Sequence, residues 1–400
     1  MERPRSMDGL SLIKRVFRNN RSLAESLRKL IWKYAEDLHR RTGEKIKIMN
    51  FCGTHEWTTV HYGLRTLMPP WVELVAGPGC PVCITPAYYV DKVIELALDG
   101  ITVYTFGDAY RLPTVRPVRG ARSLAGAKSL GGSVEVVYGF LDAVRRAREK
   151  GGVFFGIGFE TTAPSYAIPL ESKAVPRELK FLSVLRLTPP AAEYAIEAAL
   201  ERGLTPVQGI IAPGHVSTVI GARPWGVLAE KFSIPAVVSG FEPIDLLISV
   251  AMILRMLREG RVKVEIEYTR AVTWEGNKAA LKAVGRVFET VDAAWRGLGF
   301  IPMSGWALRS EFSQYNAFRE YGIEPLTPEK WVHDLPPLCK CAEVTLGLAK
   351  PTDCPMFMKS CTPDKPWGPC MVSMEGTCAV WARFGGGGLA EKVAEDIGVV

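Results

Sequence analysis

The sequence predicts an α/β protein with two similar parallel-sheet domains and a third, mainly helical and irregular region. Between residues 45 and 268, short β-rich runs alternate with longer helical stretches, as expected for parallel strands joined by crossover helices. Beyond residue 336 the chain is rich in proline, glycine and cysteine and has no clear period. We place one domain at 41–149, the second at 150–271, and assign 1–40 and 272–400 to the third region.

The first predicted element is helical and covers residues 8–40, where apolar residues recur at helical spacing, as in LAESLRKLIWKYAEDL. Nine β-rich runs follow, at 45–51, 72–76, 101–107, 134–139, 152–159, 179–187, 206–214, 235–241 and 262–268. The helical stretches between them include 87–100, 140–152, 190–203 and 242–260, and several of these end on glycine. Residues 277–299 also read as helix, so no strand is expected after about 272.

Composition excludes several classes of protein. The 400 residues are 48% hydrophobic and 23% charged, as in an ordinary globular protein. The net charge of +7 is modest and the arginines are scattered, which does not indicate a nucleic-acid partner. The longest apolar run, 246–254, is too short to span a bilayer, and the first residues lack an apolar export signal. We expect a cytoplasmic protein that is monomeric when free.

The nine cysteines fall into two separate groups. Cys52, Cys80 and Cys83 lie in the first quarter of the chain. The other six crowd into forty residues near its end and are Cys339, Cys341, Cys354, Cys361, Cys370 and Cys378. In a reducing compartment such thiols serve as ligands or reactive groups more often than as structural disulfides. The sequence therefore predicts two thiol sites with different purposes.

The C-terminal group is typical of a metal centre. We select Cys341, Cys354, Cys361 and Cys378 as ligands, since all-thiolate ligation suits zinc or an iron–sulfur cluster. The paired C-x2–4-C knuckles of zinc sites are missing among these four, whereas loose spacing beside prolines favours a [4Fe–4S] cluster. Zinc and merely buried thiols remain alternatives. Cys339 and Cys370 are surplus, and either could replace one of the chosen four.

The stretch GPGCPVC, residues 77–83, predicts a redox-active pair. Cys80 and Cys83 follow a predicted strand and precede a predicted helix, whose N-terminus could lower the pKa of Cys83. A C-x-x-C pair closes a small disulfide ring that opens and closes readily. Half of a zinc site is the competing interpretation.

The stretch NFCGTHEW, residues 50–57, repeats this strand–loop–helix arrangement with Cys52 and His55. A thiol and an imidazole at the end of a strand could form a nucleophile or half of a metal site, although a lone histidine is often only a satisfied polar residue. With Cys80 and Cys83 also on a strand end, we expect the three thiols to meet in one cleft.

Two further loops end predicted strands. GIGFETTAP, residues 156–164, offers the Glu160 carboxylate and the hydroxyls of Thr161 and Thr162, but a simple helix cap explains the threonines equally well. In APGHVS, residues 212–217, His215 is either a site residue or an ordinary polar group in a turn.

These motifs together resemble the HypD family of [NiFe]-hydrogenase maturation proteins. The likeness rests on CGTHE, GPGCPVC, GFETTAP and the final cysteine-rich run in the family's order, and it covers nearly the whole chain. It implies two α/β domains that flank a cleft and a third region holding a [4Fe–4S] cluster. It also implies that the protein works with the small chaperone HypC and the cyanide donor HypE to assemble an Fe(CN)2CO unit.

The resemblance further implies a role for each thiol. Cys52 would ligate the iron together with a HypC cysteine, with His55 close by. Cys80 and Cys83 would be the redox pair, supplied with electrons by a cluster on Cys341, Cys354, Cys361 and Cys378. Cys339 is additional to the family's usual pattern.

Two other functions use the same residues. A ferredoxin-linked disulfide reductase would need the cluster and Cys80–Cys83 but not Cys52. A zinc-stabilised binding module would need neither electron transfer nor iron.

Overall fold

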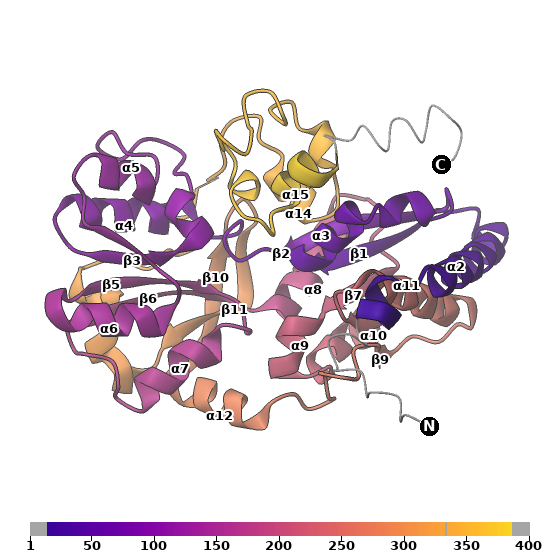
Figure 1. The fold of residues 1–400 in the computed structure, drawn as a ribbon, viewed down its shortest axis with the longest axis horizontal. Helices are drawn as coiled ribbons and strands as arrows, with labels where there is room; N and C mark the ends of the chain where they lie inside the picture. The colour runs from indigo at the N-terminus through magenta and orange to yellow at the C-terminus, as the bar shows by residue number, and fades with distance from the viewer. Residues whose placement is uncertain (1–13, 333, 386–400) are drawn as a thin grey trace, which may run out of the picture.

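The computed structural model describes residues 14–332 and 334–385. They form two sheets and a cysteine-rich segment, residues 334–385, which lies over the junction of the sheets (Figure 1). The predicted N-terminal helix is confirmed as α2 (Arg21–Thr42), preceded by one helical turn at Lys14–Arg18. Residues 8–13 of that prediction lie outside the described residues. The Asn20 side chain caps α2 at its start, and Gly43 ends it with a φ of 72°.

The first sheet has five parallel strands in the order β2-β1-β7-β8-β9. Its strands are β1 (Ile46–Cys52), β2 (Val72–Gly79), β7 (Gly209–Pro213), β8 (Ala236–Ser239) and β9 (Val264–Ile266). The helix α11 (Pro243–Arg258) packs against α2 on this side of the molecule. Pro243 stands at the first position of α11, where its missing N–H costs nothing.

The second sheet has six strands in the order β10-β11-β6-β5-β3-β4. Its strands are β3 (Val103–Phe106), β4 (Val134–Val137), β5 (Gly152–Gly158), β6 (Leu179–Arg186), β10 (Phe288–Trp295) and β11 (Gly299–Leu308). The strands β3 to β6 are parallel, whereas β11 runs antiparallel to both β6 and β10. All nine predicted strands are thus present as β1 to β9, and the α/β class is confirmed.

The two sheets are interleaved along the chain, and they do not correspond to the contiguous ranges 41–149 and 150–271. The first sheet takes β1 and β2, the second takes β3 to β6, and the chain then returns for β7 to β9. The expected seam at residues 148–152 only joins α6 (Phe140–Lys150) to β5 within one sheet. A glycine stop signal marks the end of a helix there and carries no information about which sheet the next strand joins.

The prediction that residues 277–299 form one helix is wrong in its second half. The helix α12 (Lys278–Val287) ends where β10 begins, and β10 with β11 completes the second sheet. The outer strand β10 exposes Glu289, Thr290 and Asp292, so its apolar pattern is too broken to identify as a strand. The described part of 272–400 is therefore not a separate helical region, since β10 and β11 belong to the second sheet.

The remaining helices cover the sheets and the loops at the strand ends. They are α3 (Gly53–His61), α4 (Ala87–Leu98), α5 (Leu124–Ser129), α7 (Ala163–Glu171), α8 (Thr188–Glu201), α9 (Gly214–Ile220), α10 (Gly226–Phe232), α13 (Ala317–Glu320), α14 (Cys341–Thr345) and α15 (Thr377–Phe384). Among the residues described, none of the helices combines the length and apolar character needed to cross a membrane.

The cysteine-rich segment is anchored to both sheets. Its helices α14 and α15 are yellow in Figure 1, and α14 packs against β2 while α15 packs against α3. The Trp381 indole donates a hydrogen bond to Glu56 of α3 at 2.7 Å, and the Asp334 carboxylate accepts the backbone N–H groups of Ala87 and Gly297. One buried apolar cluster includes side chains from both sheets and from this segment. Packing therefore joins three stretches that are far apart in sequence.

Candidate functional site

A cavity of about 150 Å³ lies where the carboxyl ends of strands from both sheets face each other. The residues that line it end or closely follow β1, β2, β5, β6 and β7, and one more comes from the cysteine-rich segment. They are Phe51, Cys52, Gly79, Pro81, Phe159, Thr161, Thr162, Thr188, Pro213, His215, Val216 and Glu375. The CGTH, GPGCPVC, GFETTAP and APGHVS loops all contribute to this lining. Of the three thiols expected to meet in one cleft, Cys52 lines the cavity, whereas Cys80 and Cys83 lie in the loop of which Gly79 and Pro81 line it.

Cys52 lies at the end of β1 and directly precedes α3. The backbone N–H groups of Thr54 and His55 stabilise its sulfur, as expected at a helix N-terminus. Burial, and then the nearby Glu375 carboxylate, outweigh this effect and raise the pKa of Cys52 to about 12. The side chain is therefore a neutral thiol at neutral pH and needs a bound cation to become a thiolate.

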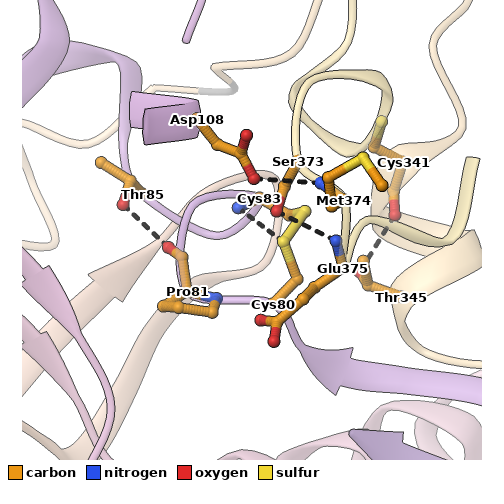
Figure 2. The surroundings of a disulfide bond; sticks show 10 residues. All are labelled: Cys80, Pro81, Cys83, Thr85, Asp108, Cys341, Thr345, Ser373, Met374 and Glu375. Atoms are coloured by element: carbon orange, nitrogen blue, oxygen red, sulfur yellow. Dashed lines mark hydrogen bonds between the residues drawn. A yellow bond between two sulfur atoms is a disulfide. The ribbon is translucent and has the colours of Figure 1, made fainter. Parts of the chain in front are cut away.

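Cys80 and Cys83 form a disulfide in the loop after β2, with their Cα atoms 5.3 Å apart. The loop is a tight turn in which the N–H of Cys83 donates to the Cys80 sulfur, and Thr85 donates to the carbonyl of Pro81 (Figure 2). Gly79 lets the loop approach β1, since a Cβ at this position would lie 1.8 Å from the carbonyl oxygen of Phe51. The disulfide is thereby held beside the strand that carries Cys52.

The two histidines singled out from the sequence take different positions. His55 is fully buried, does not line the cavity, and stacks on Phe241 with ring centroids 4.9 Å apart. Burial lowers the pKa of His55 to about 3, so its ring is neutral. His215 lines the cavity and also stacks on Phe241, with ring centroids 3.7 Å apart. Of the two imidazoles, His215 is the one that faces the cavity.

Glu160 lies behind the cavity wall. Its carboxylate accepts the backbone N–H of Thr188 at 2.7 Å and the Thr188 hydroxyl at 3.1 Å, and it is 1% exposed. Burial raises the pKa of Glu160 to about 7. These contacts tie the GFETTAP loop to the start of α8, which indicates a structural role, while Thr161 and Thr162 reach the cavity.

Glu375 is a site residue that the sequence analysis did not select. It comes from the segment between Cys370 and Cys378, lines the cavity, and accepts a hydrogen bond from the Thr54 hydroxyl at 3.2 Å. The adjacent Met374 N–H donates to Asp108 at 3.0 Å. Figure 2 shows Ser373, Met374 and Glu375 beside the disulfide, with Cys341 also close by. No sequence motif around Glu375 indicates that its carboxylate lies at the cavity.

The six C-terminal cysteines lie in one neighbourhood. The sulfurs of Cys339 and Cys341 are 3.3 Å apart, and the Cys341 thiol also interacts with those of Cys370 and Cys378. Cys354 interacts with Cys339. Cys361 joins the group through Gly368, whose N–H donates to the Cys361 sulfur at 3.5 Å. A Cβ at Gly368 would lie 2.8 Å from the sulfurs of both Cys339 and Cys341. Cys339, which the sequence left as surplus, is thus within the group.

These thiols offer the donor chemistry of a metal centre without a finished ligand sphere. Within 14–332 and 334–385, no three histidine, cysteine, aspartate or glutamate side chains have the geometry to hold a metal ion. The sulfurs instead contact one another in a chain. An all-sulfur set of this size suits zinc or an iron–sulfur cluster, and binding would require four of the sulfurs to turn toward a common centre.

Comparison with known proteins identifies the family. A family model named HypD, described as "Hydrogenase formation hypA family", matches residues 25–385. A putative hydrogenase expression/formation protein of Methanocaldococcus jannaschii is 40% identical over 372 residues, which cover 92% of this chain and 98% of that protein. The hydrogenase maturation factor HypD of Rhodobacter capsulatus is 39% identical, over 92% of this chain and 97% of its own.

A third relative, the hydrogenase maturation factor HypD of Cupriavidus necator, is 38% identical over 86% of this chain and 91% of its own length. The matched region includes the loops that line the cavity and the whole cysteine-rich segment up to residue 385. The chain therefore belongs to the HypD family of hydrogenase maturation factors.

Proposed function

We propose that this maturation factor is the scaffold on which the Fe(CN)2CO unit of [NiFe] hydrogenase is assembled, together with HypC and HypE. The observation that supports the proposal most is the meeting of three distant stretches at one cavity. These are Cys52 at the end of β1, Gly79 and Pro81 of the loop that carries the Cys80–Cys83 disulfide, and Glu375 of the cysteine-rich segment.

Cys52 is the proposed protein ligand of the iron that is being assembled. Its thiol lines the cavity, is a soft donor, and lies where backbone N–H groups stabilise negative charge on the sulfur. Binding of the iron replaces the thiol proton, which offsets the effect of burial on the pKa. The cavity of about 150 Å³ leaves room for the small diatomic ligands beside Cys52, and a HypC cysteine would complete the sulfur ligands.

Cys80 and Cys83 are the proposed store of reducing equivalents. Release of cyanide from a thiocyanate requires two electrons, and so does conversion of one disulfide and two protons into two thiols. The pair is 5% and 2% exposed, so it is shielded from thiols in solution and must receive electrons from within the complex.

A [4Fe–4S] cluster bound to Cys341, Cys354, Cys361 and Cys378 would supply those electrons one at a time. The thiols that hold it belong to the segment that also carries Ser373, Met374 and Glu375 beside the disulfide. The segment has few regular elements, and a metal centre would add to the stability that its packing against both sheets provides.

Infrared spectroscopy of the anaerobic complex with HypC tests this function. Bands in the region where metal-bound CN and CO absorb are expected for the wild type and for Thr161→Ala, which changes a cavity side chain without removing sulfur. The bands should disappear in Cys52→Ala. If they persist in Cys52→Ala, Cys52 is not the iron ligand. A ferredoxin-linked disulfide reductase would lack the bands altogether and would keep its thiol turnover in Cys52→Ala.

A further inference from the structure

A buried arginine, Arg296, lies between the disulfide loop and the cysteine-rich segment. It directly follows β10 and is 2% exposed. Its backbone N–H donates to the carbonyl of Ile84 at 2.8 Å, one residue beyond Cys83, and its Nε donates to the carbonyl of Asp334 at 3.0 Å. Neither Nη1 nor Nη2 has a hydrogen-bond partner within residues 14–332 and 334–385.

A guanidinium in this position needs negative charge nearby, because an unpaired buried ion is costly. Both carboxylate oxygens of Asp334 are already occupied by the N–H groups of Ala87 and Gly297. Burial lowers the pKa of Arg296, and the groups that oppose this shift are, in order, Asp334, Cys341, Cys339 and Asp91. Two of these four groups are thiols of the C-terminal group, the proposed ligand Cys341 and its neighbour Cys339.

The next residue, Gly297, packs the turn after β10 against the segment that carries the thiols. A Cβ at Gly297 would lie 3.2 Å from the Ala342 side chain and 2.6 Å from Leu335, so this turn packs directly against the start of α14, which carries Cys341. The turn after β10 therefore leaves no room for a side chain at position 297 beside the residue that follows Cys341. Arg296 is therefore held beside the turn that packs on α14, with Nη1 and Nη2 buried and unpartnered among the described residues.

We propose that Arg296 is a positioning residue that balances the negative charge of the C-terminal thiolates and sets the reduction potential of the centre they hold. This inference rests on the proposed function. A fixed positive charge beside a thiolate-bound cluster stabilises the reduced form, which carries one more negative charge, and so raises the potential. The free Nη1 and Nη2 groups are the donors available to thiolate sulfur.

The test is the midpoint potential of the cluster, measured by anaerobic redox titration with electron paramagnetic resonance. In Arg296→Gln we expect at least a tenfold loss in the equilibrium constant for reduction, which is about 59 mV toward negative potential for one electron. Arg296→Lys should keep most of the wild-type potential. Arg296→Met provides the same test if the glutamine variant does not fold.

Arg186 provides a matched control. It is also buried, at 4% exposed, but its guanidinium is satisfied by the carbonyls of Ala294 and Leu185 and has no cysteine among the groups that influence it. Arg186→Gln should cost stability without moving the potential. Equal potentials in wild type and Arg296→Gln would overturn the inference.

A second readout separates this inference from the proposed function. If the anaerobically purified wild type holds no iron–sulfur cluster, the proposed function fails, and Cd²⁺ binding to the metal-free protein decides the role of Arg296. Cd²⁺ exchanges for the protons of the thiols and leaves a negatively charged site. Arg296→Gln should then bind Cd²⁺ at least tenfold more weakly, and unchanged affinity would overturn the inference.

Discussion

The contact between Gly53 and Glu375 provides a sensitive test of the site. Gly53 begins α3 directly after Cys52, and a Cβ at this position would lie 2.3 Å from the carbonyl oxygen and 2.7 Å from the Cβ of Glu375. Since real Cβ atoms keep at least 3.0–3.4 Å from such neighbours, Gly53→Ala must push the 373–375 loop outward by about 1 Å. The loop would then move away from both Cys52 and the disulfide.

The expected cost has two parts. Overpacking costs about 1–3 kcal/mol, partly offset by the higher helix propensity of alanine, so the variant should remain mostly folded. A misplacement of about 1 Å between reacting groups can lower a rate by about 100-fold. We therefore expect reduction of the Cys80–Cys83 pair to slow by about 100-fold, measured by anaerobic reduction, rapid alkylation and mass spectrometry of the peptide containing both cysteines.

Gly285→Ala is the matched control. Gly285 lies inside α12, and a Cβ there would meet no atom within 4 Å. This variant should be more stable by about 1 kcal/mol and should reduce the pair at the wild-type rate. The reasoning is refuted if Gly53→Ala and Gly285→Ala show the same rate, because the loop would then not need to contact α3.

Three further predictions concern the buried Glu160 carboxylate, the hydrogen bond between Trp381 and Glu56, and the removal of metal. The pKa of Glu160 is raised from 4.5 to about 7, so its stabilising effect is present below pH 4.5 and is lost as the pH rises through about 7. Relative to Glu160→Gln, the unfolding free energy of the wild type, measured with urea, should fall by about 3 kcal/mol over that range. A difference in unfolding free energy between the two proteins that stays the same at every pH would contradict this. Trp381→Phe removes the hydrogen bond to Glu56 and should cost about 2 kcal/mol in urea unfolding, while an unchanged midpoint would show that the bond contributes nothing. Removing bound metal with a chelator should expose residues 339–376 to proteases and leave both sheets protected in hydrogen exchange. Equal protection of residues 339–376 with and without metal would show that packing alone keeps this segment folded.

The strands could be predicted from sequence because each is a short apolar run bounded by turn residues. Their partners could not, since pairing depends on contacts between distant segments, such as that of Ile48 on β1 with Gly209 on β7. The strand β10 was missed because its exposed residues interrupt the apolar pattern.

The thiols of the site could be recognised because cysteine is chemically distinctive and its spacing is informative. Glu375 and Arg296 could not, because a single charged residue has no recognisable pattern until folding brings it to the cavity or to sulfur. Glu160 is a different case, because its role as a site residue stays a prediction. Its position after a strand suggested a site residue, whereas its carboxylate is used to hold Thr188.

The most direct measurement of the central claim is a reductive titration of the anaerobic protein, which counts the electrons taken up by each molecule. If the C-terminal thiol centre delivers electrons to the disulfide, wild type should accept two more electrons than the Cys80→Ala/Cys83→Ala double variant. That additional uptake should become slow in Cys361→Ala. Equal uptake by wild type and the double variant, or an unchanged rate in Cys361→Ala, would contradict electron transfer between the two thiol sites.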